Sequence, residues 1–304
     1  MSGLRQRQSR HSRVSWAALV LLAATGTLAD AADLAAPPNA AGSDLSIVMA
    51  DDFEGAKELS ARWWMGQALA GRYWIDERQS RTGRHALALG IRESDRGCGS
   101  RCQRNEIRTD PNLRLKFGQD TWISFSFRIQ EDAFRHANRR WISGQWKQET
   151  GGSPFLAQRF DHGVFHIAVH DEHCRILVAK GDGDLVPVGT TVDTKKVEGH
   201  TFATGKQPYG CNTDVRVDSS ADPILPDPFG NWVDMTYHVR GGRQGRGLIE
   251  IWANGRFIAR VTGSIGYSQV AGPTQYFKFG IYRDAVPGST TVHLDDFKLT
   301  SGRE

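Results

Sequence analysis

This chain has few long apolar stretches, few cysteines and little net charge. Its one largely apolar stretch, residues 16–28, is too short to span a membrane comfortably, and no later segment is better suited. The formal charge of +4 falls to about +1 once residues 1–31, which hold four Arg and one Asp, are set aside. A nearly neutral chain does not favour general nucleic-acid binding, so any attraction for an anion must be local.

Several catalytic signatures are also missing. The chain has no nucleophile elbow of a serine hydrolase, no glycine-rich phosphate loop of known spacing, and no helix-turn-helix or zinc-finger spacing. Its four cysteines include no CxxC pair, so a zinc site is not supported. Other side chains must therefore carry the function.

The N-terminus has the pattern of an export signal. Four arginines precede the apolar stretch, and Ala29-Asp30-Ala31 is a small-x-small cleavage site. The sequence predicts a signal peptide over residues 1–31, a flexible leader over 32–44 and a single domain over 45–304, in a secreted or periplasmic protein. An uncleaved membrane anchor is the alternative.

Four cysteines in an exported chain favour two disulfides. Cys98 and Cys102 could close a tight loop, and Cys174 and Cys211 a larger one, but all three pairings are open.

Alternating apolar and polar residues dominate residues 45–304, as in 123–129, 165–169 and 233–239. Asn254-Gly255 marks a hairpin, and the one short helix expected is 131–138. We predict an all-β fold, a β-sandwich jelly roll of concanavalin A-like type, with one concave sheet forming a groove. Trp63, Trp64 and Trp74 are expected to fill the sandwich rather than to stack on sugars. The polar segment 181–231 is interpreted as a long excursion near the groove, tethered by Cys211.

Two acidic pairs lie at opposite ends of the domain. Asp51-Asp52-Phe53 resembles Asp295-Asp296-Phe297, which predicts neighbouring edge strands. These carboxylates could hold a structural calcium or be solvated turn residues. No other cofactor is expected.

Three segments have polar groups on one strand face. Alternation groups Arg104, Glu106 and Arg108, and likewise Gln145 with Lys147. In the third segment, Tyr276, Lys278 and Tyr282 share a face while Phe277, Phe279 and Ile281 point to the core. Three such faces indicate a binding site for a polar ligand, although each alone could be a solvated surface.

These segments resemble the motifs of jelly-roll polysaccharide lyases, a superfamily that includes heparin-lyase-like, glucuronan-lyase-like and alginate-lyase-like members. Alginate lyases of this fold have R-x-E-L-R, Q-I/V-H and Y-F-K-x-G-x-Y strands, similar in type and order to 104–108, 145–147 and 276–282. The resemblance extends over about 51–299.

The resemblance implies β-elimination at a uronic acid. Arg104 and Gln145 would neutralise the sugar carboxylate, and Tyr282 would be the acid and, in some members, also the base. Where the family usually has His, this chain has Lys147, which departs from the pattern. Lys147 could be the base or a substrate clamp, or His166 or His170 could supply the imidazole, or activity could be lost. The substrate-binding candidates are Arg108, Glu106, Arg159, Lys278, His170 and Arg283.

The sequence thus predicts a secreted, monomeric lyase that cleaves a uronic-acid-containing polysaccharide and binds neither nucleic acid nor membrane. The alternative is a non-catalytic carbohydrate-binding β-sandwich for acidic glycans. A glycoside hydrolase needs two carboxylates across the scissile bond, and the E-x-D-x-x-E string of jelly-roll glucanases is absent. The polymer, the linkage and endo or exo action stay open.

Overall fold

The computed structural model describes residues 45–55, 59, 62–97, 99, 101–113, 115–131, 140–149, 152–196, 202–204, 210–268 and 272–302. The predicted signal peptide and leader, and residues 132–138 of the predicted helix, lie outside these ranges. Within them, no helix has the length and apolar character needed to cross a membrane.

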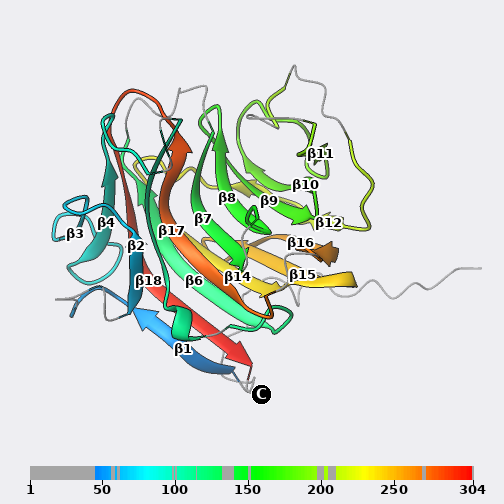
Figure 1. Ribbon diagram of the computed structural model, residues 1–304, viewed down its shortest axis with the longest axis horizontal. Coiled ribbons are helices and arrows are strands. Elements are labelled where there is room, and N and C mark those ends of the chain that lie inside the picture. The colour runs from blue at the N-terminus through cyan, green and yellow to red at the C-terminus, as the bar shows by residue number, and fades with distance from the viewer. Residues whose placement is uncertain are drawn as a thin grey trace, which may run out of the picture.

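Two nine-stranded sheets make up the fold (Figure 1). Sheet A has the spatial order β12 (Arg216–Ser219), β16 (Arg256–Ile265), β15 (Gly242–Ala253), β14 (Val233–Arg240), β6 (Thr121–Ile129), β18 (Thr290–Gly302), β4 (Ala86–Ile91) and β3 (Tyr73–Asp76), with β1 (Leu45–Asp51) paired to β18. Sheet B has the order β11 (Thr191–Asp193), β10 (Cys174–Gly181), β9 (Val164–Asp171), β8 (Leu156–Asp161), β7 (Trp141–Gln148), β17 (Gln275–Asp284), β5 (Cys102–Thr109) and β2 (Trp63–Gln67), with β13 (Ile224–Leu225) parallel to β10. A single 3₁₀ turn, η3 (Pro111–Leu113), completes the elements in the described part.

Aromatic side chains between the sheets form the core. Phe125 on β6 lies 5.3 Å from Phe277 and 5.7 Å from Phe279 on β17, measured between ring centroids. Both strands alternate, so their other faces point away from the core. The predicted β-sandwich jelly roll is confirmed.

The two acidic pairs are neighbours, as predicted, because β1 pairs with β18 and sets Asp51 opposite Phe297. The strand β18 is not an edge, however, since it also pairs with β6 and β4. Asp51 accepts a hydrogen bond from Trp63 Nε1 at 3.0 Å, and Asp295 accepts one from the Arg81 backbone N–H at 2.7 Å. The described residues contain no group of three or more His, Cys, Asp or Glu side chains that could hold a metal ion.

The excursion after β10 covers part of the outer face of sheet B. Leu185, Val186 and Phe202 of this segment form a small apolar cluster with Ala168 and Leu177 on β9 and β10. The cluster is separate from the main core, so it lies on the face turned away from sheet A. Most of the predicted site residues lie on the outer face of β7, β17 and β5, beside the edge strand β2.

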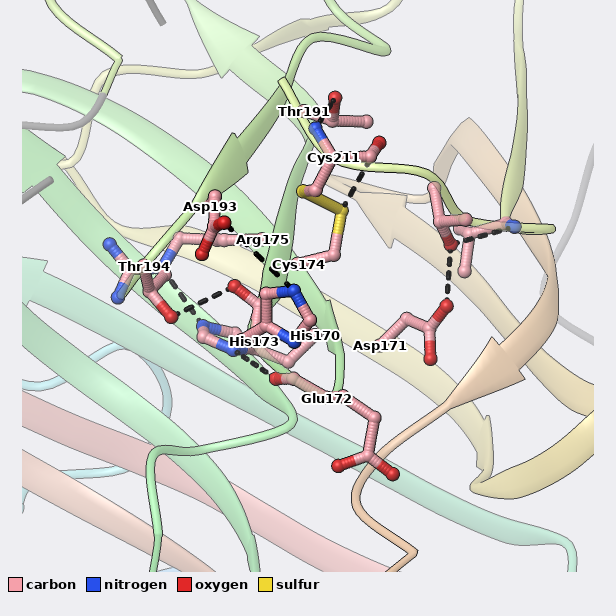
Figure 2. Close-up of a disulfide and its surroundings, with 12 residues drawn as sticks. His170, Asp171, Glu172, His173, Cys174, Arg175, Thr191, Asp193, Thr194 and Cys211 are labelled. Atoms are coloured by element: carbon pink, nitrogen blue, oxygen red, sulfur yellow. Dashed lines mark hydrogen bonds and ion pairs between the residues drawn. A yellow bond between two sulfur atoms is a disulfide. The ribbon is translucent and has the colours of Figure 1, made fainter. Parts of the chain in front are cut away.

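A disulfide between Cys174 and Cys211 ties this excursion to β10 (Figure 2). The Cys211 backbone N–H also donates to Thr191 Oγ1 at 3.2 Å. The predicted tether at Cys211 is therefore confirmed. Cys102 is disulfide-bonded as well, whereas Cys98 lies outside the described residues.

Candidate active site

The three motif segments fold into adjacent strands, with β17 between β5 and β7. The register sets Lys278 opposite Arg108 on one side and Gln145 on the other. Tyr282 lies opposite Arg104. Segments far apart in the sequence thus supply one continuous polar surface, which we call the motif face: Arg104, Glu106, Arg108, Gln145, Lys147, Tyr276, Lys278 and Tyr282.

Gly280 is required where β17 passes β5. Its φ is 142°, and a Cβ at this position would overlap the carbonyl oxygen of Asn105. A residue with a side chain would therefore push the strands apart. The pairing of β17 with β7 is also irregular here, between Phe279 and Tyr282. This bulge sets the direction of Tyr282 relative to Lys278.

Glu106 lies at the centre of the motif face and is only 1% exposed. Its carboxylate accepts a hydrogen bond from Gln145 Nε2 and lies 3.4 Å from Lys278 Nζ. Arg104 Nε is 3.1 Å from the same carboxylate, although its N–H is not aligned for a hydrogen bond. One carboxylate therefore holds two cations and an amide in place.

The motif face carries more positive than negative charge. Arg108 pairs with Glu149 at 3.3 Å, and its guanidinium carbon lies 3.9 Å from the centroid of the Tyr276 ring. With Arg104, Lys147 and Lys278, four cations face the two carboxylates Glu106 and Glu149. Such a surface favours an anionic ligand.

The Tyr282 side chain is half-buried, and its ring lies near two arginines. The Arg104 guanidinium carbon is 4.2 Å from its ring centroid, and that of Arg140 is 5.7 Å away. Arg140 is held by Asp284 at 3.0 Å. Sequence reasoning missed Arg140 because it precedes β7 and belongs to no alternating segment.

Lys147 is the departure from the motif, and its environment makes deprotonation easier. Burial, together with the nearby charges of Lys278 and Arg104, lowers its pKa to about 8, although Glu106 opposes the shift. Burial also lowers the pKa of Lys278, although Glu106 partly offsets this. A lysine with a pKa near 8 can serve as a general base near neutral pH.

The edge strand β2 adds two groups that the sequence did not reveal. Gln67 Oε1 accepts a hydrogen bond from Lys278 Nζ, and the Trp64 ring centroid is 5.3 Å from the Arg108 guanidinium carbon. Trp63 is buried as predicted, but Trp64 and Trp74 are 38% and 42% exposed, so the expectation that they fill the core is wrong. Their strands lie at sheet edges, where one face stays open to solvent.

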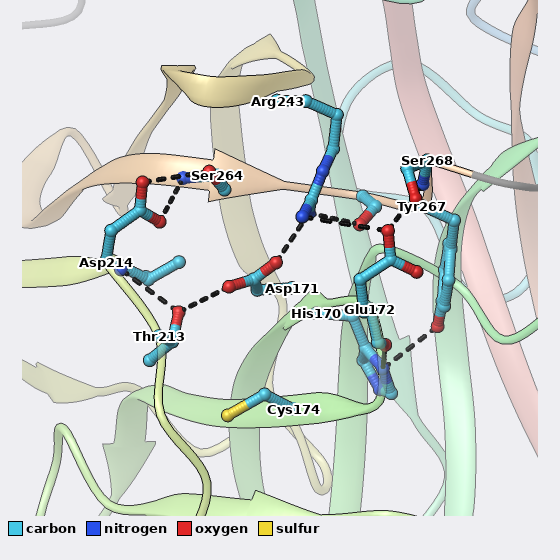
Figure 3. Close-up of polar contacts among 12 residues, drawn as sticks. His170, Asp171, Glu172, Cys174, Thr213, Asp214, Arg243, Ser264, Tyr267 and Ser268 are labelled. Carbon is cyan, nitrogen blue, oxygen red and sulfur yellow. Dashed lines mark hydrogen bonds and ion pairs between the residues drawn. The ribbon is translucent and has the colours of Figure 1, made fainter.

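The two candidate histidines lie away from the motif face, on β9. His166 is fully buried with its Nε2 3.5 Å from Asp161, and burial lowers its pKa to about 4. His170 Nε2 accepts from Arg175 Nε at 2.9 Å, and its Nδ1 is 2.9 Å from the Tyr267 hydroxyl (Figure 3). Both ring nitrogens of His170 are thus engaged within the protein.

Two predicted arginines are buried, and one of them shares the outer side of sheet B with the motif face, because the register aligns Tyr282 with Ile142 and Ile142 with Arg159. Arg159 on β8 is buried opposite His166, and burial together with Arg175 lowers its pKa. Arg283 is buried and donates to Gln103 Oε1 at 2.5 Å and to the Gly288 carbonyl at 2.8 Å. Its neighbour Tyr282 faces outward, so strand alternation directs Arg283 to the opposite side.

The fold and the motif face define a β-sandwich with a cationic surface suited to an anionic ligand. Residues 56–298 match the family model described as polysaccharide lyase, and the chain belongs to this family. It is therefore a lyase enzyme. A search of curated proteins found no match.

Solved structures with a similar fold include an endo-β-1,4-glucuronan lyase from the fungus Trichoderma reesei. It is 12% identical, with a TM-score of 0.53, over 84% of this chain and 95% of that one. Alginate lyase A1-II′ of polysaccharide lyase family 7 is 15% identical over 78% and 86% of the chains, with a TM-score of 0.45. The cellulose induced protein Cip1 is 16% identical over 83% and 96%, with a TM-score of 0.47.

Proposed function

We propose that this protein is a secreted lyase that cleaves a uronic-acid-containing polysaccharide by β-elimination on the motif face. The observation that carries the proposal is the arrangement around Glu106, which holds Arg104, Lys278 and Gln145 beside Lys147 and Tyr282. The export signal in the sequence and the Cys174–Cys211 disulfide support secretion.

The first task of the site is to neutralise the uronate carboxylate. The C5 proton of a uronate is weakly acidic, and its removal places negative charge on the adjacent carboxylate. Arg104 and Lys278 supply fixed positive charge there, and the Gln145 amide supplies a hydrogen-bond donor. Because Glu106 already orients these groups, little reorganisation is needed when the charge develops.

Proton transfer then requires a base and an acid. In this proposal the neutral Lys147 amine takes the C5 proton, and the resulting C4–C5 double bond expels the glycosidic oxygen from C4. Tyr282 donates its hydroxyl proton to that oxygen, and solvent restores both side chains. A phenol hydroxyl within reach of the leaving oxygen is a suitable general acid. The reaction needs no cofactor.

The test incubates the protein with alginate, glucuronan, heparin, chondroitin or pectate and monitors the ultraviolet absorbance of each mixture. Elimination produces a conjugated unsaturated sugar that absorbs, so at least one polymer is expected to give a rising signal. Tyr282→Phe should reduce turnover by about 10²–10⁴-fold while polymer binding is kept, the size of a lost general acid. Flat traces on all five polymers, with binding retained, would instead favour the carbohydrate-binding alternative.

A further inference from the structure

A second polar hollow lies on the outer face of sheet A, on the opposite side of the sandwich from the motif face. It has a volume of about 270 Å³ and is lined by residues that include Trp74, Asp76, Arg78, Arg128, Gln130 and His293. This volume is just below the ~300–1,000 Å³ typical of small-molecule sites, and suits one sugar ring rather than a long chain.

The strand register explains why these side chains meet. Arg128 on β6 lies opposite His293 on β18, His293 lies opposite Ala88 on β4, and Ala88 lies opposite Trp74 on β3. All four therefore point to the outer face in one row across the sheet. A Cβ at the next outward position of β4, Gly90, would press on the Trp74 ring. The small residues on β4 thus allow Trp74 to lie against the sheet.

Trp74 offers an open aromatic surface. It is 42% exposed, although a tryptophan on a sheet face is usually buried when it has a purely structural role. Flat aromatic rings with one polar edge suit ligands that combine apolar and hydroxyl surfaces, as a sugar ring does. The remaining lining residues are almost all polar.

The charges of the hollow favour an anionic sugar. The carboxylate of Asp76 accepts from the Arg78 backbone N–H at 2.9 Å and lies 3.0 Å from His293 Nε2. Arg128 donates its Nε to the Gly230 carbonyl at 3.1 Å. Among the described residues, neither the Arg78 nor the Arg128 guanidinium forms a close ion pair with a carboxylate, although Arg78 attracts Asp76 at longer range. Two cations therefore face this hollow with one carboxylate that is already engaged.

His293 is a second feature that indicates a ligand site. It is the one buried residue among those lining the hollow, at 4% exposed. Its Nε2 faces Asp76, whereas its Nδ1 has no hydrogen-bond partner within the described ranges. Buried polar atoms are nearly always paired, so an unpaired one beside a hollow needs an explanation.

We propose that this hollow binds one uronate residue of an acidic polysaccharide, with the sugar stacked on Trp74 and its carboxylate held by Arg78 and Arg128. The protein would then bind its polymer at two places, the motif face on sheet B and this hollow on sheet A. The second site shares its ligand class with the proposed function but does not depend on the elimination reaction.

The test uses the full mature chain labelled with 5-fluorotryptophan and sodium D-glucuronate as the probe. Fluorine NMR signals of Trp74 and Trp64 are assigned from Trp74→Phe and Trp64→Phe. Trp64 reports on the motif face and Trp74 on the second site. The Trp74 signal is expected to shift saturably with glucuronate and much less with D-glucose.

Charge recognition is tested by Arg78→Gln and Arg128→Gln. Each is expected to raise the Kd measured at Trp74 by about tenfold, the size of one charge-assisted hydrogen bond. Arg78 is exposed, so its substitution should leave folding intact even if that of Arg128 does not. Tyr73→Phe is the matched control, because Tyr73 is the exposed neighbour on β3 but does not line the hollow, and its Kd should stay as in the wild type.

The outcomes separate the two proposals. A Trp74 signal that stays still while the Trp64 signal saturates would overturn the second site and leave the lyase proposal standing. Equal shifts with glucose, or an unchanged Kd in both arginine variants, would overturn recognition of the uronate. A saturable Trp74 shift in a protein that cleaves none of the five polymers would support the second site and contradict the proposed reaction.

Discussion

If Lys147 is the base, catalysis must follow the titration of its amine. With a pKa of about 8, the neutral fraction is about 10% at pH 7, one half at pH 8 and 90% at pH 9. The kcat/KM value should therefore rise about tenfold between pH 7 and pH 9, and should fall by about tenfold for each pH unit below pH 7. The sign is fixed by the chemistry, since only the uncharged amine can accept the C5 proton.

Lys147→Arg isolates the proton transfer from the charge. Arginine keeps the cation but cannot lose its proton in this pH range. At pH 8–9, where the wild-type amine is largely neutral, we expect kcat to fall by about 10²–10⁴-fold, with polymer binding nearly unchanged. Lys147→Met, which removes the charge as well, should lose turnover to a similar extent and also bind more weakly. The assay is the initial rate of ultraviolet absorbance from pH 5.5 to 9.5, with binding measured separately by calorimetry.

Lys298→Arg is the matched control, because Lys298 is an exposed lysine on sheet A, far from the motif face in the fold. Its pH profile should match that of the wild type. A Lys147→Arg enzyme that keeps more than a tenth of wild-type kcat would refute the assignment. So would a profile that is flat between pH 6 and pH 9.

Three further predictions concern stability and follow from the same contacts. Glu106→Gln leaves Lys278 and Arg104 without their shared carboxylate. It should lower the free energy of unfolding, measured by urea denaturation, by about 3 kcal/mol. An unchanged free energy of unfolding would mean that Glu106 does not organise the site. Gly280→Ala should cost about 3 kcal/mol or more, because of the overlap with the β5 backbone and the positive φ; a soluble variant with wild-type Tm would contradict this. Replacing Cys174 and Cys211 by Ser opens the loop between them and should lower the free energy of unfolding by about 4 kcal/mol on the chain-entropy model. An unfolding midpoint equal to that of the wild type would contradict this.

Strand alternation predicted the motif face because it depends only on local geometry. Once β5 and β17 were recognised as strands, Glu106, Lys278 and Tyr282 had to face outward, and the register of the antiparallel pair brought them together. The same rule places Arg283 on the opposite side from Tyr282. Including Arg283 among the ligand-binding candidates therefore conflicted with the alternation itself.

Long-range contacts could not be predicted in this way. Gln67 reaches Lys278 only because β2 pairs with β5 across a separation that local patterns do not encode. His166 and His170 do alternate outward as expected, but the excursion after β10 and the neighbouring side chains bury them. Local sequence indicates which way a side chain points, but not which distant segment covers it.

The use of lysine in place of the usual histidine has a consequence for the bound state. In the free enzyme, burial and the charges of Lys278 and Arg104 lower the pKa of Lys147. A bound uronate carboxylate would neutralise part of that charge and so favour the protonated amine. The kcat/KM profile reports the free enzyme and the kcat profile reports the complex, so the kcat midpoint should lie above the kcat/KM midpoint. A histidine base would place both midpoints nearer its ordinary value of about 6.5. A kcat midpoint equal to or below that of kcat/KM would show that the cations of the motif face do not act on the base through the substrate carboxylate.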